Sequence, residues 1–207
     1  MVMYYTFANK AELLAHAKTF VSNRVNSLES DATHCISADP HDEHIAPFPI
    51  VLYCFSTIDL LGALIAGRAD ENAPTPSQSK EYMRRFMTYS PTDTDILIDL
   101  FRHKLVHLAQ PGPMIRRNSE VISWRYYHDD SYFHLKKLPA QGKKVIAASD
   151  WNIPVTHEFH ISITDFDKDI KNSTTKKPKG YLEMLKQKPH LQKNYQNAIN
   201  QIYGEIT

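Results

Sequence analysis

Apolar residues recur at helical spacing through most of the chain and predict a mainly α fold. The first apolar stripe runs over residues 9–30, where Asn9 and Glu12 have the three-residue separation of a capping box. The second covers residues 50–66, is apolar almost all round and contains a single charge, Asp59. A helix that is apolar on every side is buried, so we expect this one to be the central helix of a bundle.

The same apolar stretch allows a second interpretation, a membrane span. Residues 50–66 fall short of the roughly 20 apolar residues that a span needs, and Ser56, Thr57 and Asp59 lie among them. Hydrocarbon penalises such polar side chains, so a buried helix is favoured. Gly62 would allow another helix to approach it closely.

Two further helices are predicted over residues 79–89 and 90–110. Ser90 can cap the second of these, with Pro91 at its first position. At about 100° per residue its apolar and polar side chains form opposite arcs, except that Lys104 falls within the apolar arc without explanation. The apolar arc holds Leu97, Leu100, Phe101, Leu105 and Leu108, and the polar arc holds Asp95, Asp99, Arg102, His103 and His107.

After residue 113 the pattern changes to the alternation that is typical of β-strands. Residues 120–127 and 132–138 are predicted to form a β-hairpin, which residues 155–163 extend into a small antiparallel sheet. Two or three strands are marginally stable alone, so we expect the sheet to lie on the helices. Short helices are then predicted over residues 165–171, 181–186 and 191–203.

Composition favours a soluble globular protein with an uneven distribution of charge. The chain has 207 residues and a formal net charge of +1, yet residues 31–71 are mostly acidic and residues 166–193 are rich in lysine. Such a basic run can meet a phosphate backbone or an anionic surface, although a solvated face is the commoner case. Two cysteines, Cys35 and Cys54, and no secretory leader predict a reducing, cytoplasmic setting without membrane contact.

Residues 31–48 gather His34, Cys35, His41 and His44 among small and turn-forming residues. Imidazole and thiolate are ligands that zinc prefers. Their spacing matches no standard zinc site, so a solvated histidine-rich loop is preferred. No metal or other cofactor is expected.

The helix predicted over residues 90–110 carries the densest set of reactive side chains. Arg102 and His107 have four residues between them, and Asp99 is spaced to orient Arg102 or His103. An arginine can stabilise a phosphorane-like transition state, and a histidine can move the proton of an RNA 2′-hydroxyl near neutral pH. Metal-free RNA cleavage requires these two groups.

These residues resemble the motif of the HEPN family, helical bundles of prokaryotic toxin and defence systems that bind nucleotides or cleave RNA. The family's motif is an arginine, four to six intervening residues and a histidine, commonly with a polar residue after the arginine. Arg102, His103 and His107 match it, and the apolar helix with Asp59 fits its usual context. The resemblance covers roughly residues 9–112.

The fold that the resemblance implies is a HEPN-like bundle of four to five helices over residues 1–112. Residues 113–207 would add a small antiparallel β-hairpin or sheet and C-terminal helices packed on the bundle. No linker separates the two parts, so we expect one compact domain overall.

The function that the resemblance implies is a metal-independent endoribonuclease, related to toxins or defence, with a composite site at a homodimer interface. Arg102 would bind the scissile phosphate and His107 would be the general acid or base, supported by Asp99, His103 and Asp59. On a regular helix about 140° separates Arg102 from His107, so one copy cannot bring both to one phosphate. Two copies across a two-fold axis can.

Other functions fit the same residues. A non-catalytic HEPN-like module would bind RNA, a nucleotide or a protein partner such as an antitoxin. A metal hydrolase could use His103 and His107, but Lys104 stands where zincins have glutamate. In a structural alternative, Arg102 pairs with Asp59 or Asp99, since a buried carboxylate needs a partner. Burial of Arg102 in such an ion pair would favour this last interpretation.

Aromatic residues of the predicted strands could stack nucleic-acid bases, although core or cross-strand packing is more usual at strand spacing. They are Trp124, Tyr126, Tyr127, Tyr132 and Phe133.

Overall fold

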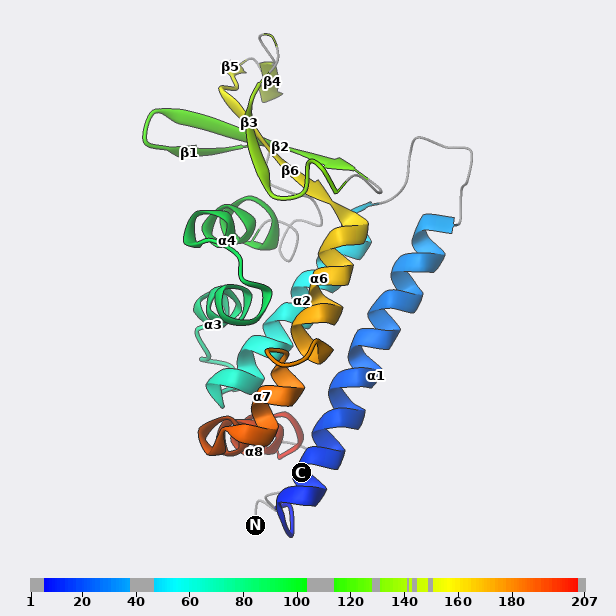
Figure 1. Cartoon of the computed structure of the whole chain (residues 1–207). Coiled ribbons are helices and arrows are strands. Elements are labelled where there is room, and N and C mark those ends of the chain that lie inside the picture. The colour runs from blue at the N-terminus through cyan, green and yellow to red at the C-terminus, as the bar shows by residue number, and fades with distance from the viewer. Residues whose placement is uncertain are drawn as a thin grey trace.

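The protein is a helical bundle with a small β-sheet at one end (Figure 1). The computed structural model describes residues 6–37, 47–103, 114–127, 131–140, 142, 145–148 and 151–204. Two π-helical turns, η1 (Met83–Met87) and η2 (Ile98–Arg102), continue α3 and α4. The helices are α1 (Lys10–Ser37), α2 (Pro47–Ala66), α3 (Thr75–Tyr82), α4 (Pro91–Leu97), α6 (Ile163–Thr175), α7 (Tyr181–Gln187) and α8 (Pro189–Tyr203).

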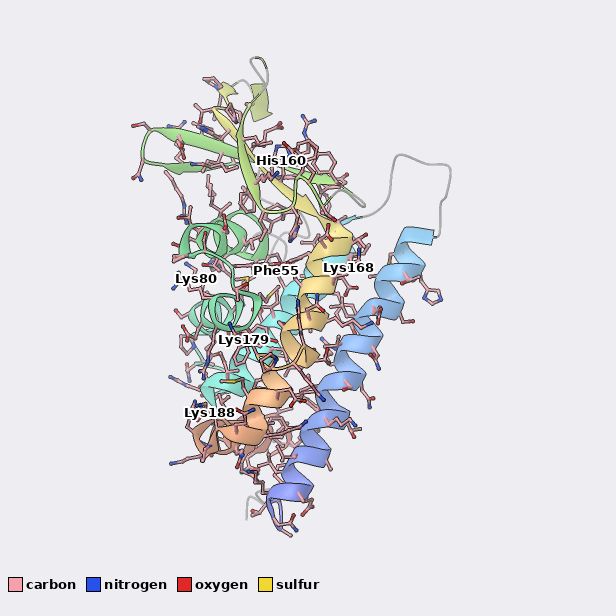
Figure 2. The ribbon with its side chains drawn as sticks, viewed as in Figure 1. Phe55, Lys80, His160, Lys168, Lys179 and Lys188 are labelled. Atoms are coloured by element: carbon pink, nitrogen blue, oxygen red, sulfur yellow. The ribbon has the colours of Figure 1, made fainter. Side chains whose placement is uncertain are left out.

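Helix α2 is the central helix, as its apolar sequence predicts. It packs against α1, α3, α6 and α8. Phe55 lies in the middle of the bundle (Figure 2), with its ring centroid 5.4 Å from that of Phe166 on α6. Residues 48–66 are long and apolar enough to cross a membrane, but most of them are buried among these helices. A core helix therefore accounts for the apolar sequence.

Helix α1 begins as predicted and extends farther than predicted. Asn9 Oδ1 accepts a hydrogen bond from the backbone N–H of Glu12 at 3.0 Å, which caps the helix. Residues 31–37 were expected in a loop, yet they continue the helix and carry His34 and Cys35 on its exposed side. The apolar stripe explains the extension, because Ala32 is buried one turn beyond the fully buried Leu28. His41 and His44 lie outside the described residues.

The sheet is mixed, so the predicted hairpin and all-antiparallel sheet are wrong. Strand β6 (His157–Ser162) lies between β2 (Glu120–Tyr127) and β3 (Lys136–Pro139), with β1 (Ile115–Arg117) on the outer side of β2. Strand β6 runs parallel to β2 and antiparallel to β3. Its residues are buried from Glu158 onward, as suits a strand paired on both sides. A separate two-stranded sheet consists of β4 (Val145–Ala148) and β5 (Trp151–Pro154).

Aromatic side chains join the sheet to the helices, which confirms that the sheet lies on the bundle. Trp124 and Tyr126 of β2 form T-shaped contacts with Phe48 on α2, at ring-centroid distances of 5.5 and 6.1 Å. Trp124 also lies 6.0 Å from Phe101 of η2. These two strand aromatics therefore belong to the packing between sheet and bundle.

The remaining aromatics of this group, Tyr127 of β2 and Tyr132 and Phe133 of the turn before β3, gather with His160 of β6. Tyr127 stacks on Phe133 at 5.0 Å and on His160 at 5.6 Å between ring centroids. Tyr132 is 70% exposed, and the ammonium of Lys136 lies 3.5 Å from the centre of its ring. Of the five candidate base-stacking residues, Tyr132 is thus the most accessible.

Helices α6, α7 and α8 confirm the three C-terminal helices predicted from the sequence. Ser162 caps α6 by accepting a hydrogen bond from the N–H of Asp165 at 3.3 Å. Helix α6 packs against α1, α2 and η1, and α8 packs against α2. The C-terminal helices therefore lie within the same bundle as α1 to α4.

Asp167 on α6 gives a prediction for the pH dependence of stability. Burial raises the pKa of its carboxyl to about 6, with Glu29 acting in the same direction and Lys171 and Lys168 opposing. Because the unfolded-state value is about 4, the native state favours the protonated carboxyl below pH 6, and this contribution to stability is lost as the pH rises through 6. Asp167→Asn should stabilise the protein at pH 7 by about 1 kcal/mol, a value reduced for solvent screening.

Thermal unfolding of both proteins between pH 4 and pH 7 measures this effect. The gain from Asp167→Asn should be largest at pH 7 and should disappear toward pH 4. Asp31→Asn, at an exposed position of α1, is the control and should show no such trend. A gain independent of pH would contradict the assignment to Asp167.

Candidate functional site

The motif residues that the structure describes lie where α4 passes into the π-helical turn η2. Helix α4 begins as predicted, because Ser90 Oγ accepts a hydrogen bond from the N–H of Asp93 at 3.1 Å. Asp99 and Arg102 belong to η2, and His103 follows directly. Lys104 and His107 lie outside the described residues.

Arg102 forms a buried ion pair with Asp59 of the central helix. Its Nε lies 3.0 and 3.1 Å from the two carboxylate oxygens, and its Nη2 lies 3.0 Å from Oδ2. Only 10% of the arginine side chain and 18% of the aspartate side chain are exposed. Ser79 of α3 also donates a hydrogen bond to Asp59 Oδ1. The carboxylate thereby ties α2 to both α3 and η2.

The π-helical turn explains why Arg102 is buried although the helical pattern placed it on a polar arc. A π-helical turn closes its hydrogen bonds over five residues in place of four, so it rotates the following residues relative to a regular α-helix. Leu100, Phe101 and Arg102 are consecutive and all buried. The guanidinium faces α2, where it pairs with Asp59, the single charged residue of that helix.

Asp99 pairs with Arg117 of β1. Arg117 Nη2 lies 2.5 Å from Asp99 Oδ2. In the described part of the chain no hydrogen bond joins Asp99 to Arg102 or His103. The half-buried His103 is next to Arg102 in sequence. The structure therefore brings Arg102 to Asp59 and leaves Asp99 in a different ion pair.

Asp95, one turn before Asp99, forms ion pairs with three cations. Lys80 of α3 lies 2.7 Å from it, Arg84 of η1 3.4 Å and Arg117 3.8 Å. The hydrogen bond from Lys80 is the main cause that lowers the pKa of Asp95, and Arg117 and Arg84 act in the same direction. Asp95 therefore stays ionised and draws α3, η1 and β1 together.

We call Lys80, Arg84 and Arg117 the basic rim. They come from α3, η1 and β1, and these three cations outnumber the two carboxylates, Asp95 and Asp99, that partly neutralise them. Figure 2 shows Lys80 at the edge of the molecule beside α3 and α4. Sequence reasoning missed this cluster, because Arg117 of β1 lies far in the chain from Lys80 and Arg84 and only the fold brings it to them.

Of the four residues of the zinc alternative, His34 and Cys35 are neighbours on α1, and His41 and His44 lie outside the described residues. His34 Nδ1 lies 2.6 Å from the carbonyl oxygen of Ser30 within α1. Among the residues that the structure covers, no group of three or more His, Cys, Asp or Glu side chains could hold a metal ion.

Comparisons with models of protein families, with curated proteins and with solved structures find no match to this chain.

Proposed function

We propose that the protein is a HEPN-like RNA-binding module in which Arg102 holds the bundle together. Burial of the Arg102 guanidinium against Asp59 carries this proposal. To bind a scissile phosphate through Nε and Nη2, the two nitrogens that bond Asp59, Arg102 would have to leave a carboxylate that is itself largely buried. Leaving one charge of such a pair without its partner is strongly unfavourable. Binding RNA without cleaving it, the other function of the motif, does not require Arg102 to leave Asp59.

The basic rim provides the RNA contact in this proposal. Its three cations lie around Asp95 and Asp99, so the cluster keeps a net positive charge next to the motif helix. Phosphate groups are attracted to such a surface without regard to base sequence. Partial neutralisation by the two carboxylates makes the binding modest in strength and sensitive to salt.

Arg84→Gln with Arg117→Gln should weaken binding to a single-stranded RNA pool and reduce its salt dependence. Each phosphate contact that is lost lowers the slope of log Kd against log salt by about 0.7, so the double variant should lose about 1.4. Fluorescence anisotropy at several salt concentrations measures this slope. Lys188→Gln with Lys193→Gln, at exposed positions of the chain outside the rim, is the control and should leave the slope unchanged.

The same RNA pool, followed on gels with and without a chelator, tests whether binding occurs without cleavage. Intact RNA in both samples is the expected result. Chelator-resistant cleavage that His107→Ala abolishes would overturn the proposal in favour of the second candidate. Unchanged salt slopes in the rim variant would reject the rim as the RNA contact.

The second candidate is the metal-independent endoribonuclease at a homodimer interface. Two observations favour it. The bonds to Asp59 use Nε and Nη2 of Arg102, and Nη1 takes no part in them. The motif also begins in a π-helical turn, a feature that is frequent at functional sites. In this candidate Asp59 orients Arg102, and a second copy of the chain supplies the other half of the site.

A further inference from the structure

A cavity of about 310 Å³ lies between η1, α6 and the connection from α6 to α7. Phe86 and Met87 form its apolar side, and Asp169 and Asn172 of α6 provide polar groups. Its volume is at the lower end of the range for small-molecule sites. Three lysines of the connection, Lys176, Lys177 and Lys179, complete its lining.

The three lysines of the cavity are exposed, and in the described parts of the chain they form no ion pair. Two lysines on either side of the connection are paired. Lys171 pairs with Glu29 at 2.6 Å, and Lys186 pairs with Glu183 at 2.8 Å. Figure 2 shows Lys179 near the α6–α7 connection. The cavity therefore carries three cations against Asp169 in its lining, with Glu183 acting on Lys177 from nearby, and an excess of positive charge remains.

The connection that carries these lysines is held in one shape by a close backbone approach. Lys176 N–H donates to the carbonyl of Asn172 at 2.9 Å, and Gly180 N–H donates to the carbonyl of Lys176 at 2.6 Å. A Cβ atom at Gly180 would lie 2.8 Å from Lys176 N and 2.9 Å from Thr174 O. Glycine thus lets the connection close on itself, which fixes the lysine backbone beside the cavity.

The opposite wall is also closely defined. Thr88, which follows η1, has a φ of 59°, a left-handed conformation that is uncommon for threonine. The hydroxyl of Tyr89 donates to Asp169 Oδ2 at 2.7 Å, and His134 Nε2 lies 3.4 Å from the same oxygen. Asp169, the carboxylate among the described lining residues, therefore already has Tyr89 and His134 as partners, which reduces its repulsion of an anion.

We propose that this cavity binds a small phosphate monoester with a flat apolar group. The phosphate lies among Lys176, Lys177 and Lys179, and the apolar group packs against Phe86 and Met87. A phosphate monoester carries a charge of about −1.5 to −2 at neutral pH, which matches three cations better than a carboxylate does. The site is separate from the basic rim and from Arg102, and it does not depend on RNA binding.

Isothermal titration with phenyl phosphate tests the proposal, with inorganic phosphate and benzoate as comparison ligands. Phenyl phosphate should bind at least about tenfold more tightly than either, because only this ligand combines the dianion with an aromatic ring. The triple variant Lys176→Gln, Lys177→Gln, Lys179→Gln should weaken its binding at least about tenfold. All three positions are exposed, so the fold should be retained, as thermal unfolding can check.

The matched control is the triple variant Lys10→Gln, Lys188→Gln, Lys193→Gln, which removes the same charge from exposed positions outside the cavity. It should bind phenyl phosphate as the unmodified protein does. The proposal is overturned if the unmodified protein does not bind phenyl phosphate, if inorganic phosphate binds as tightly, or if both triple variants lose binding equally.

Discussion

Arg102→Ala is expected to lower the free energy of unfolding by about 3 kcal/mol. The Asp59 side chain is only 18% exposed in the intact protein, and the substitution removes the cation that pairs with it. Among the described side chains, only Ser79 remains as a hydrogen-bond donor to this carboxylate. An unpaired, largely buried carboxylate is far less favourable than the intact pair. Urea unfolding followed by circular dichroism measures the loss.

Two further variants show whether the loss of stability in Arg102→Ala comes from the unpaired Asp59 or from removing any arginine. Arg84→Ala breaks a surface pair with Asp95 in which the arginine is 38% exposed, so it should cost less than about 1 kcal/mol. Replacing both partners, with Arg102→Met and Asp59→Leu, should restore most of the loss, because no buried charge remains. A loss for Arg102→Ala no greater than that for Arg84→Ala would contradict a structural role of the ion pair.

Gly62→Ala is expected to destabilise the protein by about 2 to 3 kcal/mol. A Cβ at this position would lie 2.8 Å from the carbonyl carbon of Gln78 and 3.0 Å from the backbone N of Ser79. The contact atoms belong to the backbone of α3, so relief requires the two helices to separate. Such a shift would also draw Ser79 away from Asp59.

Whether Gly62→Ala lowers or raises the free energy of unfolding tests the close contact between α2 and α3. In a helix without close neighbours, alanine in place of glycine stabilises by about 0.5 to 1 kcal/mol. A stabilised Gly62→Ala variant would therefore show that α2 and α3 do not meet closely at this glycine. Ala66→Gly, at the exposed last position of α2, calibrates the glycine penalty of this helix. Differential scanning calorimetry of the unmodified protein and the two variants shows whether each substitution stabilises or destabilises the fold.

Local signals in the sequence predicted most of the helices. The Asn9 cap, the Ser90 cap and the uniformly apolar α2 each lie on one short segment, and the structure has the corresponding elements. The mixed sheet could not be predicted in this way. Strand β2 pairs with β6 in parallel, with Ile122 opposite His157, and no turn sequence marks a pairing between strands so far apart.

The candidate site was predictable only in part, for a similar reason. Asp59 is the single charge of an apolar helix, and this alone indicated a cationic partner such as Arg102. The π-helical turn that directs Arg102 inward has no signature in the spacing of apolar residues. The rim residue Arg117 meets Asp99 only because β1 packs near η2, which is a consequence of the whole fold.

The position of β6 between β2 and β3 determines when the sheet can form during synthesis. Strands β2 and β3 leave the ribosome before β6, yet each has β6 as a neighbour. The β6-facing edges of β2 and β3 thus remain unpaired until residues 157–162 emerge, and exposed strand edges are open to association with other chains. Helices α6, α7 and α8 follow β6 in the chain, so the bundle that the sheet lies on is completed only after the last strand has emerged.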